Sequence, residues 1–192
     1  MMIKIGITGG IGSGKTFVAK QFASPIFNAD REVKKIYLND RNCYKKLKKV
    51  LPKYISSFPI SKKYLGKAIL KNKSNLRKIN NIVHPIIRKK LKKFLNKNKK
   101  KKIIVLDIPL LLENKINKKN YIIIFVEAKK KDIISNLKKR KNFNKKIFKI
   151  LNKFQLSLEF KKKRSDFVIK NNFNPSQIRK SVKMIKKKIL YK

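Results

Sequence analysis

The sequence has very few cysteine, histidine and acidic residues. Cys43 is the only cysteine and there is one histidine among 192 residues, so an internal disulfide and a cysteine-ligated metal cluster are excluded, and a zinc site is not expected. No apolar run approaches the eighteen or so residues of a membrane-spanning helix. The first residues also lack the basic, apolar and small-residue regions of a signal peptide. We therefore expect a cytoplasmic protein without a membrane partner.

Negatively charged residues are also scarce. Nine acidic residues stand against 55 lysines and arginines, which gives a formal net charge of +46. Such an excess suggests nucleic acid as a partner. However, it is almost all lysine and runs through the whole chain, whereas a nucleic-acid surface is clustered and usually adds arginine and stacking aromatic residues. We expect no specific nucleic-acid partner, only nonspecific binding of polyanions at low salt. The sequence does not define an oligomeric state.

A glycine-rich stretch near the start, GITGGIGSGKT at residues 6–16, fits the phosphate-loop pattern G-x-x-x-x-G-K-S/T from Gly9 through Gly14 to Lys15 and Thr16. The MMIKI before it is typical of a strand and the FVAKQF after it has helical spacing, which is the context that the pattern requires. Glycines allow positive φ and let consecutive backbone N–H groups converge on phosphate oxygens. The alternative is a glycine-rich turn that binds nothing. The complete pattern favours a nucleotide phosphate site.

Two side chains of this stretch have predicted roles in phosphoryl transfer. Lys15 is expected to reach the β- and γ-phosphates of ATP, and Thr16 to offer its hydroxyl to Mg²⁺. Asp107 ends the apolar run IIVL and resembles the acidic residue that orients Mg²⁺ or its waters in phosphate-loop enzymes. The alternative for Asp107 is a turn-forming residue before Pro109.

Apolar runs and helical patterns alternate along the chain. Strands are expected over 3–8, 24–30, the first part of 101–113, 121–128 and 165–172, and helices over 16–23, 31–99, 129–163 and 175–190. Within 31–99, Pro52, Pro59 and Pro85 are expected to break the helices. The alternation predicts an α/β protein with a three-layer phosphate-loop NTPase fold, a mainly parallel sheet with 101–113 and 121–128 at its centre, and an inserted helical lobe.

Three further residues are candidates for the reaction. Asp30 lies at the carboxyl end of the second expected strand, where a carboxylate could accept a proton from a hydroxyl, although Asp is also a preferred helix N-cap. Arg140 falls where a nucleotide kinase carries a lid, and could neutralise charge on the transferring phosphoryl group or belong to a solvated basic face. His84, before Pro85, has either a structural role or a supporting role in substrate binding.

Taken together, these motifs resemble the dephospho-coenzyme A kinase family almost from end to end. The resemblance rests on the phosphate loop and on FNAD at residues 27–30, IVHPIIR at 82–88, LDIPLLLE at 106–113 and SDFVIKNN at 165–172, with Arg140 and Gln155. HP in the helical lobe together with DIPLLLE on a central strand is more specific than the phosphate loop alone.

The resemblance implies transfer of the γ-phosphate of ATP to the ribose 3′-hydroxyl of dephospho-coenzyme A, with Mg²⁺. Lys15, Asp30 and Arg140 would be catalytic, with Asp30 as general base. The resemblance also implies a single domain, 1–192, with a core of 1–30, 101–128 and 164–192, a substrate-binding lobe of about 31–99 and a lid of about 129–163. The implied ATP-binding residues are Gly9, Gly10, Ile11, Gly12, Ser13, Gly14, Lys15, Thr16, Phe17 and, near the adenine, Asn171. Those implied for the acceptor are Asp30, His84, Arg88 and Asp107, and those for the metal are Thr16 and Asp107.

The chain departs from the family pattern at three places. Asn28 replaces an acidic residue, Lys62 or Lys63 stands where arginine is usual, and Leu158 occupies a lid position that is often basic. Lysine lacks the planar fork of arginine, so the grip on phosphate is expected to be weaker there. Two other classes remain open on the residues: another phosphate-loop kinase acting on a nucleoside or nucleotide, and a basic NTPase associated with nucleic acid.

Overall fold

The computed structural model describes residues 2–113, 120–139 and 143–191. The chain forms two compact units. The sheet unit takes in residues 1–28, 98–144 and 151–192, and the helical unit takes in 29–97 and 145–150. Within the described ranges, no helix combines the length and the apolar character needed to cross a lipid bilayer.

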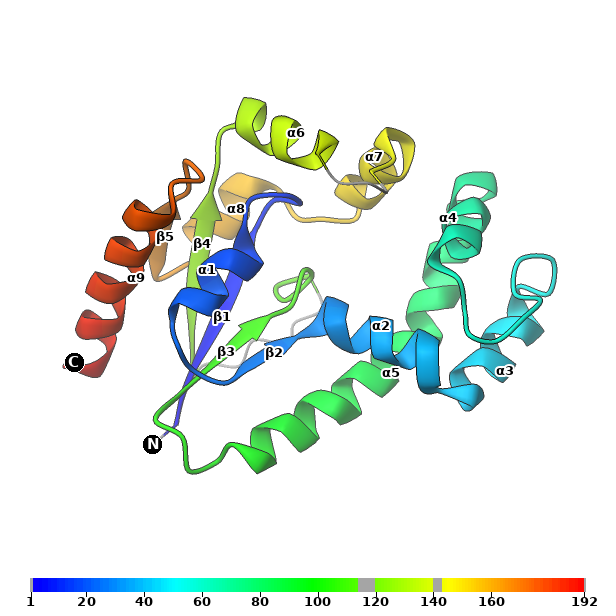
Figure 1. Cartoon of the computed structure of the whole chain (residues 1–192), viewed down its shortest axis with the longest axis horizontal. Coiled ribbons are helices and arrows are strands. Elements are labelled where there is room, and N and C mark those ends of the chain that lie inside the picture. The colour runs from blue at the N-terminus through cyan, green and yellow to red at the C-terminus, as the bar shows by residue number, and fades with distance from the viewer. Residues whose placement is uncertain (1, 114–119, 140–142, 192) are drawn as a thin grey trace. The chain divides into compact units, whose positions relative to one another are not determined.

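The sheet unit is built on a parallel sheet (Figure 1). Its strands are β1 (Ile3–Gly9), β2 (Ile26–Asn28), β3 (Ile103–Asp107), β4 (Tyr121–Glu127) and β5 (Phe167–Lys170). They are arranged in the order β2-β3-β1-β4-β5, and every pairing between them is parallel. The predicted α/β fold with a mainly parallel sheet is therefore confirmed, with β3 and β4 on either side of the central β1.

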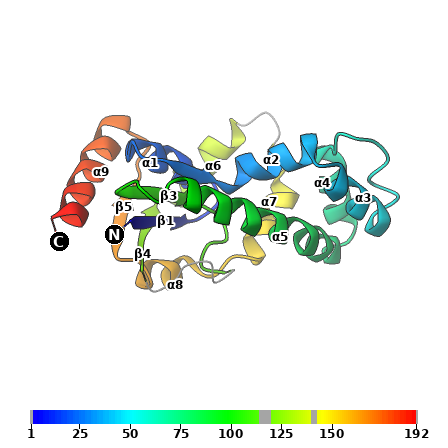
Figure 2. The same cartoon turned by 90° about the horizontal axis from the view of Figure 1, so that it is seen from below.

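Helices cover both faces of this sheet, as Figure 2 shows. On one face lie α1 (Lys15–Gln21) and α9 (Pro175–Leu190), which pack against each other, while α8 (Leu158–Lys163) contacts β1 from the other face. A further helix of this unit, α6 (Lys130–Lys138), follows β4. Alternate strand residues supply the core beneath the first face because successive strand side chains point to opposite sides. This core contains Ile5, Ile7, Val105, Ile124 and Ile169 from the strands and Val18, Phe22, Ile178 and Val182 from the helices.

The helical unit contains α2 (Ala29–Asn39), α3 (Arg41–Val50), α4 (Lys62–Lys71), α5 (Ser74–Lys97) and the first part of α7 (Lys145–Lys153). The long α5 packs against α2, α3 and α4. The helix break predicted at Pro85 is wrong, since α5 continues through it. Buried apolar residues lie on both sides of the proline, among them Ile79, Val83, Ile87 and Leu91. Their packing offsets the backbone hydrogen bond that proline cannot donate. The two other prolines of this region lie outside its helices, as predicted.

The second strand is shorter than its sequence suggested. β2 ends at Asn28, and α2 begins at Ala29. Asp30 therefore lies in the first turn of a helix, and neither the predicted strand end nor the alternative N-cap position describes it. Acidic residues in a first turn are stabilised by the helix dipole, which favours an early start for α2.

Candidate functional site

The loop between β1 and α1 has the backbone of a phosphate loop. Gly9, Gly12 and Gly14 have φ values of 143°, 83° and 87°, which side-chain-bearing residues rarely adopt. Gly14 is the N-cap residue of α1 and has no side chain to cap the first helical N–H groups. Helix N-terminal N–H groups without a capping side chain are suited to bind an anion. The predicted strand, loop and helix around this motif are thus present.

Lys15 folds back over its own loop. Its Nζ atom donates to the carbonyl oxygens of Gly9, at 3.2 Å, and Gly10, at 2.6 Å, and the side chain is buried. The ammonium group therefore lies within the loop, next to the backbone that would surround phosphate. Of the other predicted ATP-binding residues, Ser13 is buried, Ile11 is half-buried and Phe17 is exposed on α1.

A short hydrogen-bonded cluster connects the loop to the end of β3. The hydroxyl of Thr16 donates to Oδ2 of Asp107 at 2.6 Å, and the side-chain amide of Asn28 donates to the same oxygen. Asn28 and Asp107 are paired in the register of β2 and β3. Parallel strands end at the same edge of a sheet, which brings these side chains together. Asp107 is the last residue of β3 and is 3% exposed, so the alternative of a turn-forming residue does not describe it.

Thr16 and Asp107 form a donor set that suits Mg²⁺. A hydroxyl and a carboxylate are hard oxygen ligands, and Mg²⁺ is usually held by one or two carboxylates together with substrate phosphates. In the described part of the chain, no group of three or more His, Cys, Asp or Glu side chains could hold a metal ion by itself. The arrangement therefore fits an ion that arrives with a nucleotide better than a permanent structural metal.

Asn171 lies next to the phosphate loop. It follows β5, is 4% exposed, and its side-chain amide donates to the carbonyl oxygen of Ser13 at 2.7 Å. Its side-chain oxygen accepts a bond of 2.7 Å from the N–H of Phe173. The family resemblance predicts that Asn171 lies near the adenine of ATP; in the structure its side-chain amide is bonded to the loop backbone.

A buried ion pair lies on the opposite face of the sheet from α1, and its lysine was not identified from the sequence. Nζ of Lys161, in α8, lies 2.6 Å from Oε1 of Glu113 and donates to Oε1 of Gln155 at 2.9 Å. Lys161 is fully buried. Glu113 also accepts from the N–H of Leu156 at 3.1 Å. The pair therefore links the segment after β3 to the start of α8.

Three candidate residues lie in the helical unit. Asp30 is exposed in α2, while His84 is half-buried and Arg88 is exposed, one turn apart in α5. Burial, together with the positive charge of Arg88, lowers the pKa of His84. The lowered pKa favours the neutral imidazole of His84 near pH 7. Arg140 lies outside the described residues.

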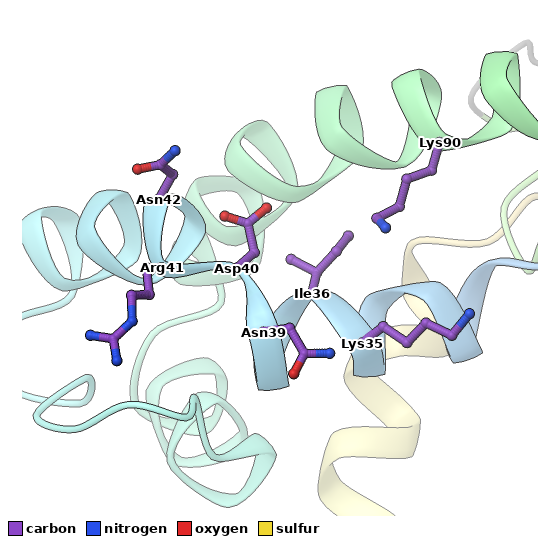
Figure 3. Close-up of a pocket in the computed structure, with 7 residues that line it drawn as sticks. All are labelled: Lys35, Ile36, Asn39, Asp40, Arg41, Asn42 and Lys90. Carbon is purple, nitrogen blue, oxygen red and sulfur yellow. The ribbon is translucent and has the colours of Figure 1, made fainter.

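An open cavity of about 460 Å³ also lies in the helical unit (Figure 3). It is lined by Lys35, Ile36, Asn39, Asp40, Arg41, Asn42 and Lys90, and Lys90 extends into it from α5 toward α2. Lys35 and Lys90 both pair with Glu32, at 2.8 and 3.4 Å. The lining is rich in cations, and none of the three candidate residues of this unit belongs to it.

Comparison with known proteins gives a consistent result over nearly the whole chain. Residues 3–177 match the family model for dephospho-CoA kinase. The dephospho-CoA kinase of Wolbachia pipientis wMel is 34% identical over 186 residues, which cover 94% of this chain and 95% of that protein. Among solved structures, TT1252 from Thermus thermophilus has a TM-score of 0.78 and 24% identity, with 96% of both chains covered. The dephospho-CoA kinase from Campylobacter jejuni has a TM-score of 0.66 and 24% identity, with 98% of both chains covered. The two structures share the fold described above.

Proposed function

The chain belongs to the dephospho-CoA kinase family, and on that premise we propose that it transfers the γ-phosphoryl group of ATP to the ribose 3′-hydroxyl of dephospho-coenzyme A. The products are coenzyme A and ADP, so the reaction is the last step of coenzyme A biosynthesis. The observation that supports this proposal most directly is the cluster of Lys15, Thr16 and buried Asp107 around a phosphate loop. Lys15 provides an ammonium group for the phosphates of a nucleoside triphosphate, and Thr16 and Asp107 provide oxygen ligands for its Mg²⁺.

The chain's own residues account for the donor side of the reaction. Lys15 has an ammonium group within the loop and would exchange its carbonyl contacts for oxygens of the β- and γ-phosphates. Thr16 and Asp107 would hold Mg²⁺, which neutralises charge on the phosphates when bound. Asn28 fixes the orientation of the Asp107 carboxylate through its hydrogen bond to Oδ2.

The acceptor side is assigned to the helical unit. Asp30 would take the proton from the 3′-hydroxyl while the 3′-oxygen attacks the γ-phosphorus of ATP. The bond between the γ-phosphorus and the β–γ bridging oxygen breaks, and ADP leaves. His84 and Arg88 would contact the acceptor. A neutral imidazole at position 84 suits a hydrogen-bonding role better than charge neutralisation. Arg140 would neutralise charge on the departing phosphoryl group.

One assay separates the proposal from its two alternatives. The purified protein is given ATP and Mg²⁺, and ADP release is followed by a coupled assay with dephospho-coenzyme A, nucleosides or polynucleotides. We expect rapid ADP release only with dephospho-coenzyme A. Release that responds instead to nucleosides would identify another phosphate-loop kinase, and release that requires DNA or RNA would identify a nucleic-acid-associated NTPase.

A further inference from the structure

The side chain of Asn171 is fixed at both ends by backbone groups. Oδ1 accepts from the N–H of Phe173 and Nδ2 donates to the carbonyl oxygen of Ser13, each at 2.7 Å. The backbone N–H of Asn171 donates to the carbonyl oxygen of Glu127 at 2.6 Å. Residue 171 is therefore held by the end of β4 and by the turn that follows β5. Its side-chain NH₂ group is directed at one peptide of the phosphate loop.

That peptide joins Ser13 to Gly14. A trans peptide is planar, with its carbonyl oxygen and its N–H on opposite sides. A bond that holds the Ser13 carbonyl toward Asn171 therefore turns the N–H of Gly14 away from Asn171. Glycine adopts positive and negative φ almost equally well, so the φ of 87° at Gly14 is not enforced by the residue type. The bond from Asn171 acts on this orientation of the peptide from outside the loop.

The packing around Gly14 supports that role for Asn171. A Cβ atom built on Gly14 would collide with Nδ2 of Asn171, so the missing side chain is what lets the amide reach Ser13. The amide is buried, and a buried hydrogen bond is costly to break because the separated groups lose contact with water.

We propose that Asn171 is a positioning residue that orients the Ser13–Gly14 peptide so that the N–H of Gly14 faces bound phosphate. It acts on nucleotide affinity through the phosphate groups, rather than by contacting the adenine. The role of Asn171 rests on the proposed function only in taking a nucleoside triphosphate as the phosphoryl donor. Asparagine is required because the position needs an acceptor for Phe173 and a donor for Ser13 at once.

Two substitutions of Asn171 test the proposal. Asn171→Asp keeps the acceptor for Phe173 but places an oxygen against the Ser13 carbonyl, and Asn171→Leu removes both bonds without adding charge. Asn172→Asp is the control for charge, because Asn172 is the exposed neighbour and bonds to Gln177 instead of the loop. The dissociation constants of ATP, GTP and inorganic tripolyphosphate are measured by calorimetry or competition, with melting temperatures in parallel.

We expect both Asn171 variants to bind ATP and tripolyphosphate about tenfold to a hundredfold more weakly, with the ratio of ATP to GTP affinity unchanged. The Asn172→Asp control should bind both ligands as the wild type does. Weakening of ATP binding without weakening of tripolyphosphate binding would overturn the proposal and assign Asn171 to the adenine. Weakening in the Asp variant alone would also overturn it, since charge would then be the cause.

A measurement on the wild-type protein covers the case in which neither Asn171 variant folds. In a ¹⁵N-labelled sample, tripolyphosphate should move the amide proton resonance of Gly14 downfield, because a hydrogen bond to phosphate deshields it. An unmoved Gly14 resonance at saturation would overturn the proposal. No acceptor is needed in these experiments. If both Asn171 variants bound tripolyphosphate more weakly than the wild type while dephospho-coenzyme A was not phosphorylated, the proposed function would fail and the role of Asn171 would stand.

Discussion

Nζ of Lys15 donates to the carbonyl oxygens of Gly9 and Gly10, which holds the ammonium group beside the loop that would surround the phosphates of a nucleotide. We predict that Lys15→Ala abolishes turnover and lowers ATP affinity while leaving the melting temperature nearly unchanged. The matched control is Lys20→Ala in the last turn of the same helix, where the lysine is exposed. Steady-state kinetics and thermal melting on the two variants decide the matter. Wild-type activity in Lys15→Ala would mean that the phosphate loop does not hold the reacting nucleotide.

The carboxylate of Asp30 is expected to affect both stability, through the dipole of α2, and turnover, through proton transfer. Asp30→Asn removes the favourable interaction with the α2 dipole, which is worth about 0.3–1 kcal/mol, so stability should change little. Asparagine cannot accept the proton of a hydroxyl, so the turnover rate should fall by about two to four powers of ten with ATP still bound.

The control for Asp30 is Asp40→Asn. Asp40 caps α3 through the N–H of Cys43, and asparagine caps a helix about as well as aspartate, so neither stability nor turnover should change. Turnover, ATP affinity and melting temperature are measured together on both variants. Near-normal turnover in Asp30→Asn would remove the general base from the mechanism.

At the scale of elements, α8 is tied to the segment after β3 by the buried pair of Glu113 and Lys161. Removing one partner of a buried ion pair leaves an uncompensated charge, so Lys161→Met should lower the free energy of unfolding by about 3–5 kcal/mol. The double variant Glu113→Gln with Lys161→Met should recover much of that loss. Lys162→Met is the control, because Lys162 pairs with Glu127 at the surface. This substitution should lower the free energy of unfolding by less than about 1 kcal/mol.

Urea unfolding of these variants measures the predicted difference. If Lys161→Met were as stable as Lys162→Met, the buried charge pair would not hold α8 in place. If the double variant were less stable than Lys161→Met alone, the hydrogen bonds of Glu113 would matter more than its charge.

Elements differ in how far the sequence predicts them. The apolar runs that became β3 and β4 are unambiguous because a buried parallel strand has apolar residues on both faces. Asp30 was misplaced because a three-residue strand followed directly by a helix has no turn residue to mark the boundary. The continuation of α5 through Pro85 is decided by tertiary packing on both sides of the proline, which local propensity does not contain.

The candidate site was predictable to the extent that its chemistry is local. The spacing of the phosphate loop gave Lys15 and Thr16, and the apolar run before Asp107 placed that carboxylate at a strand end, where it meets Thr16. The bond from Asn171 to Ser13 joins residues 158 positions apart, so no local pattern could give it. Lys161 begins a run of three lysines that reads as a solvated face, and only tertiary packing buries the first of them. The lid and the acceptor contacts stay predictions.

At the scale of the whole molecule, the net charge of +46 acts on every polyanion that the protein meets. We predict binding of random-sequence RNA at low salt that weakens steeply as salt is raised, because it depends on counterion release. Exposed charges are screened beyond about 8 Å at physiological ionic strength, so the kinase reaction should persist where RNA no longer binds. Fluorescence anisotropy with labelled RNA and the coupled assay are run over the same salt series. Turnover that disappears together with RNA binding would indicate that nucleic acid takes part in the activity.

The most direct test of the proposed reaction is the identity of its phosphorylated product. The protein is incubated with ATP, Mg²⁺ and dephospho-coenzyme A, and the mixture is followed by ³¹P NMR, with 3′-deoxy-dephospho-coenzyme A as the control acceptor. We expect one new phosphomonoester resonance, that of coenzyme A, to grow with ADP, and no new phosphomonoester with the 3′-deoxy acceptor. ADP formed together with free phosphate alone, or a phosphomonoester that also forms on the 3′-deoxy acceptor, would contradict transfer to the ribose 3′-hydroxyl.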